Sequence, residues 1–436
     1  MSALPEASLR DSARVVFVGV LPVVLRGLFS PRRRWMKWLT ALDMDARAVK
    51  ALSELRAKHP GQGARLLGGR IVVLWGSDAI REVLDKSADV YASDSGAKGK
   101  GMSHFQPDAL TLSRGEEWRD RRAFNEAVLS TSEGVHPLGE RFLAVVEDEV
   151  TRLRIGGELS WTEFERLFDR MTLRVIFGDR SRDDQQLTGL LERLMGEANR
   201  LVALSETDDY YEFYGLLERH LRDPEPGSLI SRFADAPQSD TTRVVHQIPH
   251  WIFAMRDTLG ANTYRALAAI VADQEVRERV RSELEGADLS DPSAVDGLSY
   301  LGGCLQEAMR LWPTTPMLAR EVTRETTLAG ETVDEGTQVM ILNTFNHRDR
   351  DQVPDADALA PERWSNGNRD YRFNHLSNGT QGCPGGPLVL LLGRAVLARV
   401  LSEYELDLRE PELDGGGSLP HMLDFFSIRF GARLAA

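Results

Sequence analysis

The chain has little cysteine, with only Cys304 and Cys383 among its 436 residues. Two cysteines cannot build a disulfide scaffold or a four-thiolate zinc site. Their scarcity is typical of a reducing compartment, so we expect a cytoplasmic protein. Each cysteine is therefore either an inert core residue or a reactive thiol or metal ligand.

Long apolar runs and an excess of basic residues are also missing. The uncharged run from Val15 to Leu25 has eleven residues, whereas a membrane-spanning helix needs about 20. We expect a short helix that covers the body of the fold, or a surface segment that touches a membrane or a substrate-access mouth, but no stable membrane span. The chain carries 53 basic and 66 acidic residues, a formal net charge of −13, which argues against nucleic-acid binding.

Helical periodicity dominates what is present. It predicts helices over residues 47–59, 77–88 and 388–404 and throughout 116–285. Residues 244–283 would form one central helix of about 60 Å if continuous. Short strands are predicted at residues 64–67, 70–74, 326–328, 331–333 and 338–342, and a late hairpin within 419–430. We expect a mainly α fold with a minor β part from about 60–75, 320–345 and 405–430, in one domain (47–436) preceded by an N-terminal segment (1–46) with a short apolar helix.

Cys383 lies in a glycine-dense stretch, with glycines at positions 379, 382, 385 and 386 and an apolar helix directly after it. Glycines let the backbone approach a large flat group closely, and a helix N-terminus favours a thiolate. From this stretch alone, Cys383 is a haem-iron ligand, a nucleophile with His375 as its base, or a buried turn residue. Cys304 is most simply a small core residue.

Several segments together identify a family. The cysteine loop resembles the haem-binding signature of the cytochrome P450 monooxygenases, which Gly379, Cys383 and Gly385 match. Leu376 replaces the usual aromatic residue of that signature and Gln381 the usual basic one. The resemblance extends from about residue 45 to residue 430 and implies the triangular, mainly helical P450 fold, of the bacterial soluble type.

Two further motifs occur in the order that the resemblance requires. Glu307-Ala-Met-Arg310 is similar to the family's Glu-x-x-Arg pair, and Pro361-Glu-Arg363-Trp364 is similar to the motif whose arginine joins that pair. Glutamate and arginine three residues apart share one helix face. If buried, two arginines and one glutamate need each other's charge, so we expect a structural triad of Glu307, Arg310 and Arg363 near the cysteine loop.

The resemblance also implies the cofactor and its contacts. It makes Cys383 the axial ligand of the iron of haem b, with Gly379, Gln381 and Gly385 in the surrounding loop. Trp118 and Arg122, four apart on a helix, resemble one contact to the haem propionates, and Arg320 resembles another.

The central helix carries Asp257-Thr258, which matches the acid–alcohol pair of the family. The resemblance implies that the alcohol hydrogen-bonds the dioxygen co-substrate and that the acid delivers protons to it. The alternative is that Asp257 pairs with a nearby arginine and Thr258 bonds back to its own helix. Met255 stands where a small glycine normally lets the helix bulge, and Arg256 precedes the acid.

These features favour a monooxygenase that inserts one oxygen atom into a hydrophobic organic substrate. The alternatives are a peroxide-driven fatty-acid peroxygenase, to which Arg256 and Gln381 point, and a non-enzymatic haem-thiolate sensor. The resemblance suggests apolar pocket walls; the residues we expect there are Phe253, Met255, Arg256, Met317, Phe425 and Phe426. His104 and Phe105 would belong to a mobile loop over the pocket.

Electrons must come from another protein, because no second cofactor motif is present. The resemblance implies a ferredoxin or flavodoxin-type donor with its reductase, supplied originally by NAD(P)H, and a role in secondary metabolism. An acidic donor would dock near the cysteine, where Arg121, Arg122, Arg394 and Arg399 are the expected contacts.

Overall fold

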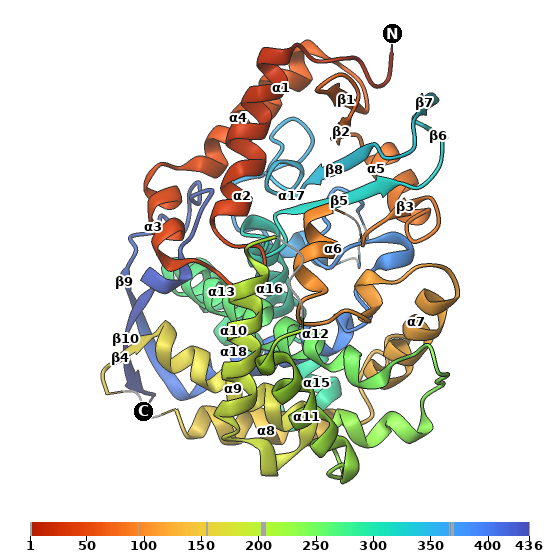
Figure 1. Ribbon diagram of the computed structural model, residues 1–436. Coiled ribbons are helices and arrows are strands. Elements are labelled where there is room, and N and C mark those ends of the chain that lie inside the picture. The colour runs from red at the N-terminus through yellow and green to blue at the C-terminus, as the bar shows by residue number, and fades with distance from the viewer. Residues whose placement is uncertain are drawn as a thin grey trace.

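The computed structural model describes residues 2–94, 96–153, 156–201, 206–365, 367 and 370–435. A helical body carries a five-stranded sheet on one side and a three-stranded sheet on another (Figure 1). The predicted mainly α fold with a minor β part is confirmed.

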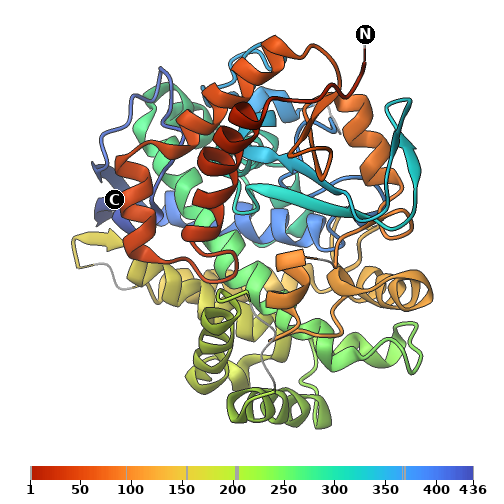
Figure 2. The ribbon, with the colours of Figure 1, turned by 45° about the horizontal axis from the view of Figure 1, so that its top comes forward.

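The N-terminal segment forms a series of short helices that cross one face of the body (Figure 2). They are α1 (Leu9–Val15), the π-helical turn η1 (Val16–Val20), α2 (Leu21–Leu25), α3 (Arg33–Ala41) and the longer α4 (Met44–Lys58). Val15 packs in an apolar cluster with α4 and β2, and Met36 and Leu39 of α3 join the main core. Nowhere in the described residues is a helix both long and apolar enough to cross a membrane.

The five-stranded sheet joins two distant parts of the chain. Its strand order is β1 (Gly63–Leu66), β2 (Ile71–Leu74), β8 (Gln338–Leu342), β5 (Met317–Val322) and β3 (Tyr91–Ala92). β2 pairs with β8 in parallel and the other neighbours pair antiparallel. β6 (Thr326–Leu328) and β7 (Glu331–Val333) form a separate hairpin. Because strands so far apart in sequence must pair, the β part and the helical body fold as one interlocked unit.

The predicted hairpin within residues 419–430 is wrong. The last strand is β10 (Arg429–Leu434), and it pairs with β9 (Tyr404–Glu410) and β4 (Glu158–Ser160) in a sheet of its own. Residues 405–430 therefore do not extend the five-stranded sheet. The aromatic residues before β10 instead form a 3-10 turn, η9 (Phe425–Ser427), which turns toward the interior of the body.

The body consists of helices packed around one large apolar core. They are α5 (Ser77–Asp85), α6 (Gly96–Met102), α7 (Gly115–Leu129), α8 (Gly139–Thr151), α9 (Trp161–Phe177), α10 (Gln185–Ala198), α11 (Asp208–Arg222), α12 (Ile248–Phe253), α13 (Gly260–Ala272), α14 (Gln274–Leu284), α15 (Pro292–Asp296), α16 (Ser299–Leu311), α17 (Asn343–Asn346) and α18 (Gly386–Glu403).

The central helix is shorter than predicted. It runs through α12, the π-helical segment η6 (Ala254–Leu259) and α13, and it ends at Ala272 rather than near Glu283. Asp273 leaves the helical conformation, and its carboxylate accepts a hydrogen bond from the backbone N–H of Val276, which begins α14. An aspartate is a favoured N-cap, so it starts a new helix inside an otherwise uninterrupted periodic pattern.

Candidate functional site

The cysteine loop lies against the C-terminal end of α5 and the start of α18. The backbone N–H of Cys383 donates to the carbonyl of Leu376 (2.9 Å), and α18 begins three residues later. Gly379 adopts φ +65°, and a Cβ there would lie 2.4 Å from the Leu84 carbonyl carbon. Only glycine fits at that position, and the close approach fixes the loop on the fold.

Burial has the largest effect on the pKa of the Cys383 thiol. It raises the pKa of Cys383 above its ordinary value, although the Gly385 backbone N–H and the charge of Arg122 act in the opposite direction. From the sequence we expected the helix N-terminus to favour the thiolate. In the structure, the effect of burial on the pKa is larger and favours the thiol. A bound metal ion would deprotonate a thiol in this position.

His375 does not serve Cys383 as a base in the described structure. Its ring contacts those of Trp364 and His347, with centroid distances of 5.0 and 6.1 Å, and its buried Nδ1 has no hydrogen-bond partner among the described residues. Burial lowers the pKa of His375 to about 4. This arrangement speaks against the interpretation of Cys383 as a nucleophile.

Two arginines approach the cysteine loop from different elements. Arg122 of α7 donates to the carbonyl of Gly382, and Trp118 lies half-buried one turn earlier on the same helix. Arg320 of β5 is 5% exposed and donates to Ser87 Oγ (3.0 Å) and the Ala319 carbonyl (2.9 Å). Within the described residues no carboxylate forms an ion pair with Arg320, and burial lowers its pKa to about 10. A buried cation is costly without an anion, so Arg320 fits an anionic group bound here.

Lys98 of α6 is a second cation at this place, and sequence reasoning missed it. Its Nζ donates to the Thr111 carbonyl (3.3 Å), which also accepts from Ser93 Oγ (3.0 Å). Ser93 Oγ in turn accepts from Nε2 of Gln381 (3.2 Å), and the buried Gln381 Oε1 has no hydrogen-bond partner in the part of the chain that the structure describes. Burial and the nearby Arg320 lower the pKa of Lys98 to about 7. The cation missing at position 381 is therefore supplied from α6, and the two carboxylates of a haem fit this pair of cations.

The residues of the expected triad lie together in the interior. Arg310 donates two hydrogen bonds of 2.7 Å to the Glu307 carboxylate, and both side chains are fully buried. Arg363 lies 3.3 Å from the same carboxylate, which also accepts from Trp364 Nε1 (2.9 Å). Arg310 further donates to the carbonyls of His347 and Ala356. These contacts hold the segment 347–364 against α16. They also give each buried charge the partners that it needs.

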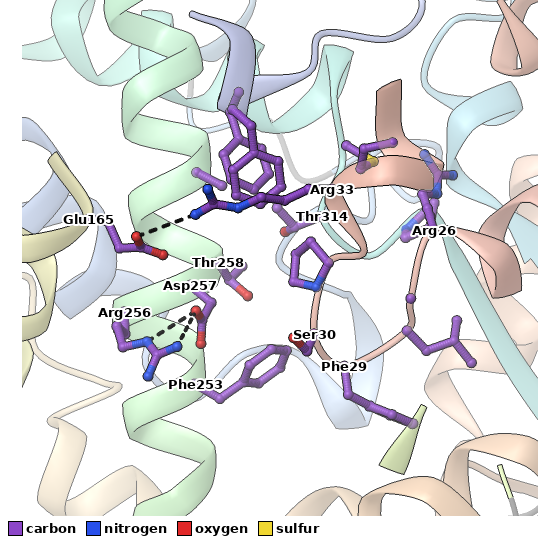
Figure 3. A pocket seen from close by; sticks show the side chains of 18 of the residues that line it. Arg26, Phe29, Ser30, Arg33, Glu165, Phe253, Arg256, Asp257, Thr258 and Thr314 are labelled. Atoms are coloured by element: carbon purple, nitrogen blue, oxygen red, sulfur yellow. Dashed lines mark hydrogen bonds and ion pairs between the residues drawn. The ribbon is translucent and has the colours of Figure 1, made fainter. Parts of the chain in front are cut away.

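A cavity lies between η6 of the central helix and the N-terminal loop before α3 (Figure 3). Asp257 and Thr258 face it from the helix, and Phe29 and Ser30 face it from the loop. Further lining comes from α9, the segment after α16 and η9; the remaining residues include Arg26, Arg33, Trp161, Glu165, Glu192, Phe253, Arg256, Arg265, Thr314, Pro316, Phe425 and Phe426. Seven charged side chains line the cavity, so the expectation of purely apolar walls is wrong.

Asp257 shares an arginine with a second acid. Arg256 lies 3.1 Å from Asp257 Oδ1 and 3.3 Å from Asp169 of α9, and it donates to the Thr188 carbonyl (3.3 Å). The other Asp257 oxygen is buried, and no described residue forms a hydrogen bond with it. Burial raises the pKa of Asp257 above its ordinary value although Arg256 opposes the shift, and burial raises the pKa of Asp169 to about 6. The carboxyl pair therefore holds protons more tightly than free aspartates do.

Four of the six expected pocket residues line the cavity: Phe253, Arg256, Phe425 and Phe426. Met255 points into the main core, and Met317 packs on the apolar cluster around β2 and α4. The helix forms the π-helical segment at Met255 without a glycine there. The N-terminal loop was not named among the pocket residues, although a substrate-access mouth was one alternative for residues 15–25, because nothing in its composition distinguishes a cavity wall from an ordinary surface turn. His104 and Phe105 are buried, and His104 pairs with Glu197 (2.9 Å).

The arginines expected to receive an electron donor are largely engaged within the fold. Arg121 is 3% exposed and donates to the Thr241 carbonyl and Asp108, so it does not belong to a docking surface. Arg122, Arg394 and Arg399 each form an ion pair, with Glu126, Asp296 and Glu147 respectively.

Comparison with known proteins relates part of the chain to one family. Residues 228–414 match the family model described as Cytochrome P450. The chain is similar to "Probable cytochrome P450 4d20" of Drosophila melanogaster, with 26% identity over 249 residues, or 54% of this chain and 48% of that protein. It is also similar to "Cytochrome P450 4V2" of Rattus norvegicus (27% over 184 residues; 40% and 35%) and to "Cytochrome P450 monooxygenase sphH" of Aspergillus fumigatus (24% over 213 residues; 44% and 39%).

The chain thus spans about half or less of the length of these relatives. All three are eukaryotic proteins, so they give no support to the expected bacterial soluble type. The region that matches the family model contains the π-helical segment with Asp257 and Thr258, the buried charge cluster and the cysteine loop. The chain is therefore similar to the cytochrome P450 family over residues 228–414.

Proposed function

We propose that this protein is a haem-dependent monooxygenase that inserts one atom of dioxygen into an organic substrate. One observation carries the proposal: two cations, Arg320 and Lys98, lie beside the loop of the buried Cys383 thiol, and no carboxylate among the described residues forms an ion pair with either of them. We infer that Cys383 holds the iron of haem b and that Arg320, Lys98, Arg122 and Trp118 hold its propionates. Haem bound in this way supplies dioxygen binding and activation, supported by electron donation from the thiolate.

The residues of η6 would supply the protons. Thr258 faces the cavity and can donate a hydrogen bond there, and Asp257 can receive a proton at its unpartnered Oδ2 and pass it on. Arg256 holds the other Asp257 oxygen, and Asp169 offers Arg256 a second partner. We infer that movement of Arg256 toward Asp169 frees Asp257 for proton transfer.

The same contacts weigh against the fatty-acid peroxygenase. In that alternative an arginine beside the acid binds the carboxylate of the substrate. Here the Arg256 guanidinium is engaged by two carboxylates and a backbone carbonyl, so it is not free for that role. A sensor would have no use for an acid–alcohol pair at the cavity.

The charged lining changes the expected substrate. Arg26, Arg33 and Arg265 face the cavity together with Phe253, Phe425 and Phe426. Burial lowers the pKa of Arg265 to about 10, and no acid forms an ion pair with it among the described residues. We propose a small amphipathic organic substrate with an apolar body and polar or anionic groups. Electrons would come from NAD(P)H through a separate ferredoxin or flavodoxin-type partner in the cytoplasm.

The reduced, carbon-monoxide-bound spectrum of the protein purified with haem tests the central inference. We expect the strongly red-shifted main band of thiolate-ligated haem in the wild type and in Cys304→Ser. Cys383→Ser should lose that band. A wild-type spectrum without the shift, or a Cys383→Ser variant that keeps it, would show that Cys383 does not hold the iron.

A further inference from the structure

Arg265 differs from the other cations that line the cavity. Four arginines line it, and three of them have carboxylate partners: Arg26 pairs with Asp45, Arg33 with Glu165, and Arg256 with Asp169 and Asp257. Among the residues that the structure describes, no acid forms an ion pair with Arg265. The proposed function gives this cation no part in proton transfer, although it lies at the wall of the same cavity.

The Arg265 side chain is only 6% exposed and keeps part of its hydrogen-bonding capacity unused. Its Nε donates to the Leu423 carbonyl (3.0 Å) and its Nη1 to the Trp312 carbonyl (3.2 Å), whereas no described residue accepts a hydrogen bond from Nη2. Burial lowers the pKa of Arg265 to about 10, and the charge of Asp424 opposes this shift only from beyond ion-pair distance. A buried cation without a paired anion is costly, so this place fits an anionic group.

Aromatic rings form the wall of the cavity beside Arg265. The Arg265 guanidinium lies 5.1 Å from the centroid of the Phe425 ring. The Phe425 ring in turn lies 4.5 Å from the Trp161 ring and 4.2 Å from the Phe426 ring, and all three rings line the cavity. The cavity has a volume of about 150 Å³, which is the size of a cavity that holds benzene. This space suits a single aromatic ring, whereas a long alkyl chain exceeds it.

The position of Arg265 on the central helix relates this cation to the acid–alcohol pair. Arg265 follows Thr258 by seven residues, and both residues line the cavity. Seven residues are close to two helical turns, so the two side chains share one side of the helix about 10 Å apart along its axis. A molecule whose anionic end lies at Arg265 therefore directs its opposite end toward Thr258, which faces the cavity (Figure 3).

We propose that the cavity binds a small aromatic carboxylate, with its carboxylate group on Arg265 and its ring among Trp161, Phe425 and Phe426. The planar guanidinium matches the geometry of a carboxylate. A phosphate ester fits less well, because one unpaired cation balances one negative charge and the charge of Asp424 acts on the same place. As a substrate, which rests on the proposed function, the acid would present the carbon farthest from its carboxylate to Thr258.

Isothermal titration calorimetry of the full-length protein purified with haem tests the binding itself at pH 7. The probes are 3-phenylpropionate, the uncharged 3-phenylpropionamide of the same size, phenyl phosphate and dodecanoate. We expect the wild type to bind 3-phenylpropionate at least roughly tenfold more tightly than the amide, because only the carboxylate forms charge-assisted hydrogen bonds with Arg265. Phenyl phosphate and dodecanoate should both bind more weakly than 3-phenylpropionate.

Variants of Arg265 locate the anion. Arg265→Gln should bind 3-phenylpropionate roughly 30-fold more weakly than the wild type and should lose the preference for the acid over the amide. Arg265→Lys keeps the charge without the planar fork, so we expect it to restore part of that preference. Arg277→Gln is the matched control, because Arg277 of α14 is half-buried, donates to the Leu406 carbonyl (3.1 Å) and does not line the cavity. It should bind all four probes like the wild type.

Equal affinity of the wild type for the acid and the amide would overturn the proposal, and this comparison needs no variant to fold. Tighter binding of dodecanoate or phenyl phosphate than of 3-phenylpropionate would also overturn it, because the substrate class would then be different. So would an Arg265→Gln variant that keeps the preference for the acid while Arg33→Gln loses it. Calorimetry requires neither electrons nor turnover, so its failure is separate from failure of the proposed function.

Discussion

Position 381 shows how one side chain can stand in for another that is far away in sequence. Gln381 is neutral, and its Nε2 bonds Ser93 rather than a charged group. Ser93 shares the Thr111 carbonyl with Lys98, so a chain of three hydrogen bonds joins the glutamine amide to the ammonium group. Together with Arg320, Lys98 gives the site the positive charge that the two carboxylates of a bound haem would require.

Replacement of Lys98 by methionine should weaken haem retention. One charge-assisted hydrogen bond contributes about 1.5–3 kcal/mol, so we expect haem to leave Lys98→Met roughly tenfold faster than the wild type. Transfer of haem to an excess of apomyoglobin measures the rate. Lys100→Met is the control, because Lys100 is an exposed residue on the same helix. Equal rates for the two variants would remove Lys98 from the cofactor site.

Replacement of Thr258 by alanine should uncouple electron use from product formation. The hydroxyl faces the cavity and lies next to the only acid on η6, so its loss interrupts proton delivery. We expect product per electron consumed to fall at least roughly tenfold while peroxide release rises. Thr263→Ala, in the buried part of α13, is the matched control. Unchanged coupling in Thr258→Ala would leave the hydroxyl without a part in the reaction.

At the scale of elements, the contact between α9 and η6 determines the charge state of the carboxyl groups beside the cavity. Asp169 comes from α9, and Arg256 and Asp257 come from η6. Glu165 of α9 and Glu192 of α10 raise the pKa of Asp169 further, in addition to the larger effect of burial. The carboxylates outnumber the cations in this contact, so a proton taken up here is held to a higher pH than on a free aspartate.

The pKa of Asp169 has a consequence for stability. Its folded-state value of about 6 lies above the ordinary 3.8, so the folded protein binds this proton more tightly than the unfolded chain. The resulting stability is fully present below pH about 4 and is lost as the pH rises through about 6. Asp169→Asn removes this loss. We expect the variant to gain about 1–2 kcal/mol at pH 8, discounted for partial exposure, and nothing at pH 4, measured by urea unfolding.

Asp183 supplies a control of opposite sign. The charges of Arg170 and Arg182 lower its pKa in spite of partial burial, so its contribution is present above the ordinary pKa and is lost as the pH falls. Asp183→Asn should therefore lose stability at pH 8. A pH-independent effect of Asp169→Asn would show that the carboxyl titrates normally in the folded state.

Local patterns predicted the elements whose boundaries are local. Strands β6, β7 and β8 have the predicted bounds because Gly330 and Gly336 separate them, and both glycines adopt positive φ. The end of the central helix was missed, because Asp273 interrupts a pattern whose apolar spacing continues into α14. The partner of the last strand was also missed, since its register depends on β4, about 270 residues earlier.

The candidate site divides in the same way. Motifs close in sequence, such as Glu307 with Arg310 or Asp257 with Thr258, could be read from their spacing. Lys98, Asp169 and the N-terminal loop were missed because only the folded chain brings them to the site. Arg121 was misjudged for the converse reason: its position in a charged helix suggests exposure, but packing against Thr241 buries it.

On the scale of the whole molecule, the charge distribution limits how electrons arrive. The chain carries a net charge of −13, and the arginines near the cysteine side are paired with Glu126, Asp296 and Glu147. Reversal of Arg394 would break its ion pair with Asp296 and disturb packing on Gly302, so its first effect should be on stability. An acidic donor would thus meet few free cations there, and docking should depend less on salt than in a complex steered by charge.

The source of the inserted oxygen distinguishes the two enzymatic alternatives for the intact protein. Because Arg256 is held by Asp169 and Asp257, and because the acid–alcohol pair is retained, we expect turnover to require dioxygen and two electrons from a reductase system. With a substrate that displaces the iron-bound water, labelled dioxygen should place one labelled atom in the product. Labelled hydrogen peroxide alone should give at most a few per cent of that rate, and Asp257→Asn should slow the reductase-driven reaction by roughly 100-fold. Efficient turnover with peroxide alone, unaffected by Asp257→Asn, would make the protein a peroxygenase. Mass spectrometry of the product decides between the two outcomes.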